Sequence, residues 1–129
     1  MSYAVYYNQA ERIIEVKVQG NVAKEDVKEI FHQWLEIAKE QKCFSVLYDW
    51  REATLSRLST MDIYELPRIL AKMVIPLGIR PARLRRAVVT SENEDEDKAR
   101  FAETVTANVG QVAKFFHDMD AARKWLGQN

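Results

Sequence analysis

Asp49, Trp50 and Arg51 are the residues of this chain whose types and position most favour ligand recognition. They end an apolar run over residues 44–50, which is typical of a central strand covered on both faces. Open α/β sheets bind ligands at the carboxyl ends of their parallel strands. We therefore predict that Asp49 and Arg51 are polar anchors at the mouth of a pocket. The alternative is that they pair with each other or with neighbouring backbone.

The segment from Arg51 to Arg86 breaks an otherwise even charge balance. It holds eight basic and three acidic residues, a net charge of +5, whereas the nineteen basic and nineteen acidic residues of the whole chain cancel. Its interleaved apolar residues exceed what one short helix needs to pack on a sheet. A basic, apolar helix that contains Pro67 is typical of a lid over an apolar ligand, or of a segment on an anionic membrane surface.

Two sets of residues carry this prediction. The set that would contact a ligand or form the lid comprises Trp50, Leu58, Leu66, Ile69, Leu70 and Met73, beside Asp49 and Arg51. The basic set that would face a membrane or a partner comprises Arg57, Arg68, Lys72, Arg80 and Arg83. The alternative is a core helix with a solvated basic face and a buried turn at residues 74–77. A partner-protein or homodimer surface is a further use of the same patch.

Residues that could bind a metal or perform catalysis form no recognisable pattern. His32 and His117 are isolated, without a partner at metal-ligand spacing. The acidic run over residues 92–97 lacks the spacing and the glycine of a calcium loop, and is typical of a solvated helix start. Glycine motifs for phosphates or dinucleotides are missing, so no cofactor is predicted. An enzyme would need a cleft that gathers Asp49, Arg51 and His117, and we predict a protein without catalytic activity.

Hydrophobic periodicity predicts the elements that must position these residues. Their order is β-β-α-β-α-β-α-β-α, a mostly parallel sheet with an antiparallel edge strand at the N-terminus and helices packed on it. Pro67 is expected to kink the second helix or to end its first short turn, and Gly20 to end the second strand. The expected strands are 3–7, 12–19, 44–50, 86–90 and 112–116, and the expected helices are 24–41, about 60–73, 96–108 and a last one capped by Asp118 or Asp120.

Composition sets the broad class. The 129 residues, 47% hydrophobic and 29% charged, suit one folded domain over residues 1–129. The balanced charge disfavours nucleic acid as a partner. The single Cys43 suits a reducing compartment. Neither a secretory signal nor a run of about 20 apolar residues is found, so we expect a cytoplasmic protein that can reach the inner face of the membrane.

The element order and several strand ends resemble those of the SpoIIAA-like proteins of the STAS superfamily. The matching residues are Gly20, the sequence LYDWR at 47–51, RAVV at 86–89, DAA at 120–122 and WL at 125–126. The resemblance covers essentially the whole chain and implies the α/β fold of that family. It also implies a non-enzymatic binding or switch domain, with an architecture comparable to the lipid-binding CRAL-TRIO domains.

The chain departs from the anti-sigma-factor antagonists of this superfamily at their phosphorylated serine. These proteins carry an Asp-Ser-Ser-Gly-like stretch after the third strand, whereas residues 49–54 here read DWREAT, and hydroxyls follow only at Ser56, Ser59 and Thr60. Ser59 and Thr60 are candidate phosphorylation sites, because a phosphate at a helix N-terminus meets free amide groups. The alternative is that they simply cap the helix.

Two hypotheses of function follow. The first is a SpoIIAA-like, non-catalytic domain that binds an apolar or amphipathic ligand such as a lipid, or associates peripherally with membrane, through residues 55–79. The second is a protein-interaction switch of the anti-sigma-factor-antagonist type.

Overall fold

The computed structural model describes residues 1–92 and 96–127 of the chain. Acidic residues 94 and 95, part of the predicted solvated helix start, lie outside the described residues. The strands are β1 (Ser2–Asn8), β2 (Ile13–Asn21), β3 (Ser45–Thr54), β4 (Arg85–Thr90) and β5 (Val112–Phe116). The helices are α1 (Lys24–Gln41), α2 (Thr60–Val74), α3 (Glu96–Asn108) and α4 (Met119–Leu126), with short 3₁₀ turns η1 (Ile75–Leu77) and η2 (Pro81–Arg83).

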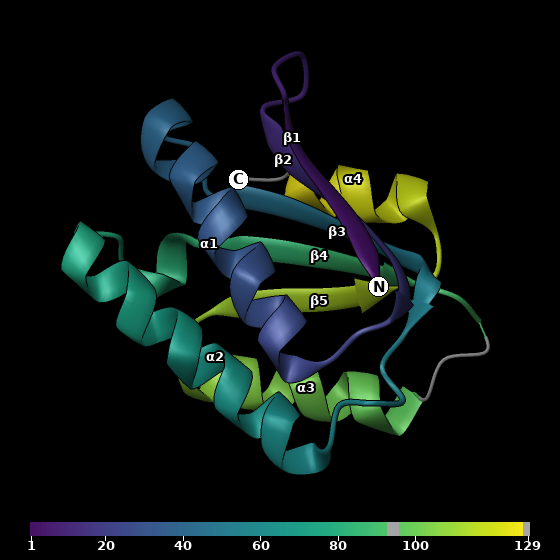
Figure 1. Cartoon of the computed structure of the whole chain (residues 1–129). Coiled ribbons are helices and arrows are strands. Elements are labelled where there is room, and N and C mark those ends of the chain that lie inside the picture. The colour runs from purple at the N-terminus through teal and green to yellow at the C-terminus, as the bar shows by residue number, and fades with distance from the viewer. Residues whose placement is uncertain (93–95, 128–129) are drawn as a thin grey trace.

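The five strands form one sheet in the order β1-β2-β3-β4-β5. β1 pairs antiparallel with β2, and the other neighbours are parallel. Figure 1 shows α1, α2 and α3 on one face of this sheet and α4 on the other. The predicted class, a mostly parallel α/β sheet with an antiparallel N-terminal edge and β3 at its centre, is confirmed.

The second strand is longer than its alternation of apolar and polar residues predicts. Gly20 was expected to end it, but the strand continues to Asn21, and Gly20 pairs with Ala53. The register shifts between Lys17 and Gln19, and Gly20 adopts a φ of 91°, which a residue with a Cβ rarely takes. Gly20 thus lies within the last residues of this strand, close to the register shift, and the strand ends one residue later than expected.

The main core lies between the sheet and the three helices on its first face. Ile30 and Trp34 of α1 are fully buried against Ile14, Val16 and Val46 of the sheet. A smaller apolar cluster, with Leu47, Val89 and Leu126 among its members, lies between α4 and the opposite face. The two sides of β3 are thus covered by different helices, as its continuous apolar run predicts.

α2 differs from the prediction in two places. It runs from Thr60 to Val74, and Pro67 lies inside it. The prediction that a short first turn ends at Pro67 is therefore wrong. The alternative of a buried turn at residues 74–77 is also wrong: Val74 is buried, but Ile75 is 63% and Leu77 43% exposed. Among the described residues, no helix is both long enough and apolar enough to cross a bilayer.

Candidate ligand chamber

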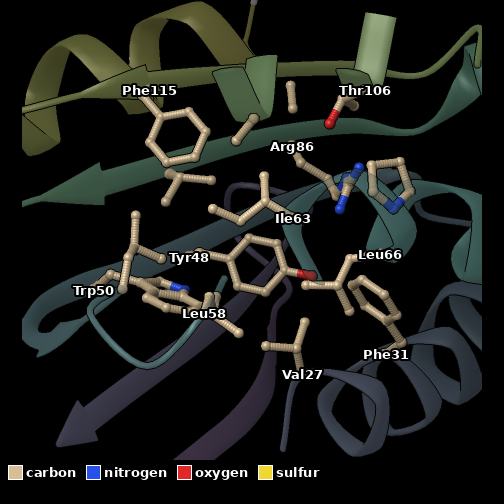
Figure 2. A pocket seen from close by; sticks show the side chains of 15 residues that line it. Val27, Phe31, Tyr48, Trp50, Leu58, Ile63, Leu66, Arg86, Thr106 and Phe115 are labelled. Atoms are coloured by element: carbon tan, nitrogen blue, oxygen red, sulfur yellow. The ribbon is translucent and has the colours of Figure 1, made fainter. Parts of the chain in front are cut away.

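A cavity of about 90 Å³ lies inside the main core, and we call it the chamber. Side chains from α1, β3, the segment after β3, α2, β4, α3 and β5 line it. Figure 2 shows aromatic and aliphatic side chains around the space, among them Tyr48, Trp50, Ile63 and Phe115. The walls are therefore mostly apolar, and the polar groups that interrupt them determine what the chamber can recognise.

The predicted ligand residues divide between the two faces of the sheet. Trp50, Leu58 and Leu66 line the chamber. Asp49 and Arg51 alternate with Trp50 along β3, so they point to the opposite face, where they line a separate polar hollow. There Arg51 Nε and Nη2 donate to Asp49 Oδ1 and Oδ2 at 2.9 and 2.8 Å. The alternative that these two residues pair with each other is the arrangement observed.

The remaining residues of the predicted ligand set do not line the chamber. Leu70 is fully buried in the core, Met73 is half-buried and packs against that core, and Ile69 is half-buried. Leu55, Ile63 and Pro67 from the same stretch of chain line it instead. The predicted segment thus contributes to the wall of the cavity, but the spacing along α2 places a different subset of its side chains there, and its role in ligand binding remains a prediction.

Arg86 is the chamber residue that sequence reasoning missed. Its side chain enters from β4 and is only 8% exposed. Nη2 donates to Gln111 Oε1 at 2.6 Å, and Gln111 Nε2 in turn donates to the Pro67 carbonyl at 2.7 Å. Arg86 Nε has no hydrogen-bond partner, and among the described residues no carboxylate forms an ion pair with Arg86.

A signal for Arg86 was present in the sequence. Arg85 and Arg86 are consecutive at the start of a strand, so their side chains must point to opposite faces. Because helices cover both faces, one of the two is forced into the core. Arg85 instead reaches the α4 side, where Nη2 donates to the Trp125 carbonyl at 2.9 Å.

Burial changes the ionisation of two chamber groups. Desolvation lowers the pKa of the Arg86 guanidinium, but this group remains protonated in proteins. Desolvation also raises the pKa of Tyr48 to about 12, so its hydroxyl is neutral at pH 7. This hydroxyl accepts a hydrogen bond from Trp34 Nε1 at 2.5 Å. The chamber thus contains one positive charge and neutral groups around it.

The residues of a hypothetical catalytic cleft do not converge. His117 follows β5 and is exposed, with Nε2 3.3 Å from Glu96 Oε1 and Nδ1 3.4 Å from the Thr90 carbonyl oxygen. The hydrogen bond to Glu96 raises the pKa of His117. Asp49 and Arg51 lie in the hollow on the other face. Within the described part of the chain, no group of His, Cys, Asp and Glu side chains could hold a metal ion.

The predicted basic set is distributed over the link before α2, the outer surface of α2 and the turns after it. Arg68 lies 3.8 Å from the centre of the Tyr64 ring, and Arg83 lies 4.6 Å from that of Phe44. Arg57, Lys72 and Arg80 are exposed. Met61, Tyr64, Arg68, Lys72 and Ile75 follow one another at intervals of three or four residues, so they form one stripe along the helix. We call it the outer stripe.

Ser59 is the N-cap of α2. Its Oγ accepts from the Asp62 amide at 3.0 Å, and Asp62 Oδ2 accepts from the Ser59 amide at 3.0 Å, which completes a capping box. Thr60 is the first residue of the helix and is exposed. The capping role of Ser59 is thus observed, whereas phosphorylation of Ser59 or Thr60 remains a prediction.

Comparison with known proteins places this geometry in a family. A family model described as SpoIIAA-like matches residues 13–127. A crystal structure of an uncharacterised protein of the DUF3478 family with a SpoIIAA-like fold, from Shewanella loihica PV-4, is similar with a TM-score of 0.52. The two chains are 16% identical, and the alignment covers 97% of this chain and 92% of that one. A search of curated proteins finds no match.

Proposed function

The chain belongs to the SpoIIAA-like family, and from that premise we propose that it is a non-catalytic binding module for a small apolar or amphipathic molecule held in the chamber. The observation that carries this proposal is an apolar cavity in the core that also contains polar atoms without partners. The Trp50 indole Nε1 and Arg86 Nε are both buried and unbonded. Buried polar atoms without partners are rare in native folds, and a ligand would provide the missing acceptors.

The volume of the chamber limits the size of a ligand that fits without movement of its walls. A cavity of about 90 Å³ is smaller than the roughly 150 Å³ that accommodates benzene in an engineered protein core. Ligand pockets in proteins usually measure about 300–1,000 Å³. We infer that a ligand larger than a few heavy atoms displaces part of the wall. The segment from Leu55 to Ile63 suits this role, because it consists of the link between β3 and α2 and the first turn of that helix.

Native mass spectrometry of the purified protein, followed by extraction with organic solvent, tests the proposal. We expect a bound apolar species that organic solvent releases. For protein stripped of this species, 1-octanol should raise the melting temperature and change the emission of Trp50, whose indole lines the chamber. The Trp50→Phe variant, which keeps Trp34 and Trp125, should lose the change in emission. A stripped protein that neither 1-octanol nor the extracted species stabilises would contradict the proposal.

Peripheral membrane association is a second candidate, favoured by a separate observation. Met61 is 61%, Tyr64 40% and Ile75 63% exposed, and all three belong to the outer stripe, together with the cations of Arg68 and Lys72. An apolar helix face that carries basic side chains binds the interface of anionic bilayers. This surface lies outside the chamber, so the two proposals are independent.

Sedimentation with vesicles tests the membrane proposal. At low salt, the protein should bind vesicles that contain an anionic lipid more strongly than neutral ones. Replacing both Met61 and Ile75 by Ser should weaken binding about tenfold, because two exposed apolar side chains no longer enter the interface. The matched control is Val112→Ser, which removes an exposed apolar side chain from β5. Equal binding by the double variant and the control would exclude the outer stripe.

A further inference from the structure

The proposed function does not specify the chemical class of the ligand. The positive charge of Arg86 in the chamber restricts that class. Resting on that function, we propose that the ligand is an amphipathic monocarboxylate whose carboxylate binds Arg86 and whose apolar tail extends along the chamber. Two observations carry this inference. They are the buried guanidinium without an acidic partner and the apolar walls beside it.

The charge of Arg86 is not balanced by a carboxylate among the described residues, although its guanidinium lies 5.9 Å from the centre of the Phe31 ring. Its Nη2 donates to Gln111, and the Tyr48 hydroxyl lies close enough to influence its ionisation, but both of these groups are neutral. Among the described residues, the ion pairs involve other basic side chains. Burying a charge without a counter-charge is strongly unfavourable, and a bound anion removes this penalty. A carboxylate oxygen is the natural acceptor for the free Nε–H, because charge-assisted hydrogen bonds are the stronger ones.

The single positive charge of Arg86 matches the charge of a carboxylate better than that of a phosphate monoester. Arg86 is the single positive charge among the side chains that line the chamber. A carboxylate brings one negative charge, whereas a phosphate monoester brings close to two at neutral pH. The second charge would itself be buried without a partner. Tyr48, neutral at pH 7, has a hydroxyl that can donate to an anion but cannot repel it.

The positions of the lining side chains set the direction of the ligand. Figure 2 shows Arg86 and the Tyr48 hydroxyl toward one end of the space, and Trp50 and Leu58 toward the other. Ile63 lies between the two ends. A headgroup at Arg86 therefore directs an alkyl tail toward Trp50 and Leu58, along the strands of the sheet. This division between a charged end and an apolar end distinguishes an amphipathic ligand from a purely apolar one.

Binding of three probes with the same tail length tests the inference. We would measure the affinity of octanoate, 1-octanol and octylamine for stripped protein by calorimetry and by the shift in melting temperature. Octanoate should bind tightest and octylamine weakest. Arg86→Met should weaken octanoate binding about tenfold to a hundredfold and leave 1-octanol binding nearly unchanged. The matched control, Arg100→Met, removes one positive charge from an exposed position of α3 and should change neither affinity.

The outcomes separate this inference from the proposed function. Equal affinities for octanoate and 1-octanol, both unaffected by Arg86→Met, would overturn the carboxylate and leave the apolar chamber intact. Failure of all three probes to bind would overturn both. A measurement on the wild type does not depend on the folding of a variant. The side-chain Nε–H signal of Arg86 in NMR spectra should move on addition of octanoate and not on addition of 1-octanol, and an unmoved signal with octanoate bound would refute the inference.

Discussion

One acidic and one basic side chain are buried among the described residues, and they differ in whether a group of opposite charge bonds to them. Glu15 is 7% exposed, and its carboxylate accepts hydrogen bonds from Arg123 Nη2 at 2.7 Å, Asn8 Nδ2 at 2.7 Å and the Tyr6 hydroxyl at 3.1 Å. Arg86 is buried to a similar degree, but its Nη2 donates to the neutral Gln111. The charge of Glu15 is thus balanced by Arg123, whereas Arg86 has no counter-charge within the described part of the chain. This contrast makes Arg86, and not Glu15, the candidate for ligand recognition.

The pH dependence of stability should reveal the role of Glu15. Burial alone would raise the pKa of this carboxyl, but the hydrogen bonds from Arg123, Asn8 and Tyr6 outweigh burial and lower it. A carboxyl whose pKa is lower in the folded state stabilises the fold above its unfolded pKa of about 4.3. This contribution is lost as pH falls through the folded-state pKa. Urea unfolding from pH 7 to pH 3 should therefore show a shallower loss of stability for Glu15→Gln than for the wild type.

A matched control isolates this effect from the general effect of acid. Glu40→Gln removes an exposed carboxyl near the end of α1, and its stability profile should follow that of the wild type. At pH 7, Glu15→Gln should be the less stable variant, because Arg123 loses a charged partner in a half-buried position. Parallel acid profiles for the wild type and Glu15→Gln would show that the Glu15 network does not contribute to stability.

At the scale of elements, α2 presents apolar side chains on two sides. Ile63, Leu66 and Pro67 face the chamber, whereas Met61, Tyr64 and Ile75 belong to the outer stripe. The excess of apolar residues between residues 55 and 79 was evident from the sequence. Which of them face a cavity was not, because a cavity depends on how α1, α2 and α3 meet above the sheet. Residue types alone do not distinguish a cavity wall from close packing.

The start of α2 is stabilised by the capping box of Ser59 and Asp62. Ser59→Ala should lower the free energy of unfolding by about 1 kcal/mol, because the Asp62 amide loses its acceptor. Ser56→Ala is a suitable control, since Ser56 is exposed and lies before the helix. Urea unfolding of both variants measures the difference. Equal stabilities would mean that the cap contributes little, and the hydroxyl of Ser59 would then be free for another use.

Asp49 and Arg51 show where prediction from sequence fails at a strand end. The rule that ligands gather at the carboxyl ends of parallel strands directed attention to β3, which does contribute Tyr48 and Trp50 to the chamber. The alternation of side chains along that strand then separates Trp50, in the chamber, from Asp49 and Arg51 on the opposite face. Sequence alone left open which face holds the apolar cavity. The same uncertainty concealed Arg86, which was counted only in the net charge of residues 51–86.

For the whole molecule, the strand order explains why the chamber lies on one side only. β2, β3, β4 and β5 are neighbours in sequence order, and α1, α2 and α3 connect them in turn. Right-handed crossovers between strands added in one direction place all three helices on the same face. The elements and the parallel sheet followed from the sequence, but the spatial order of the strands did not. That order places α2 beside α3 on the face of the sheet that α1 also covers (Figure 1). Side chains from these three helices and from β3, β4 and β5 line the chamber.

The chamber should lower the stability of the whole molecule, because it leaves apolar walls partly uncontacted and a charge unpaired. Ala113→Val adds two methyl groups to a half-buried residue of β5 that lines the chamber. We expect a gain of about 1 kcal/mol in the free energy of unfolding together with weaker octanoate binding. The same substitution at Ala4, exposed on the edge strand β1, should change neither quantity appreciably. If Ala113→Val left octanoate binding unchanged, the ligand could not occupy the space beside β5, and the chamber would not be its site.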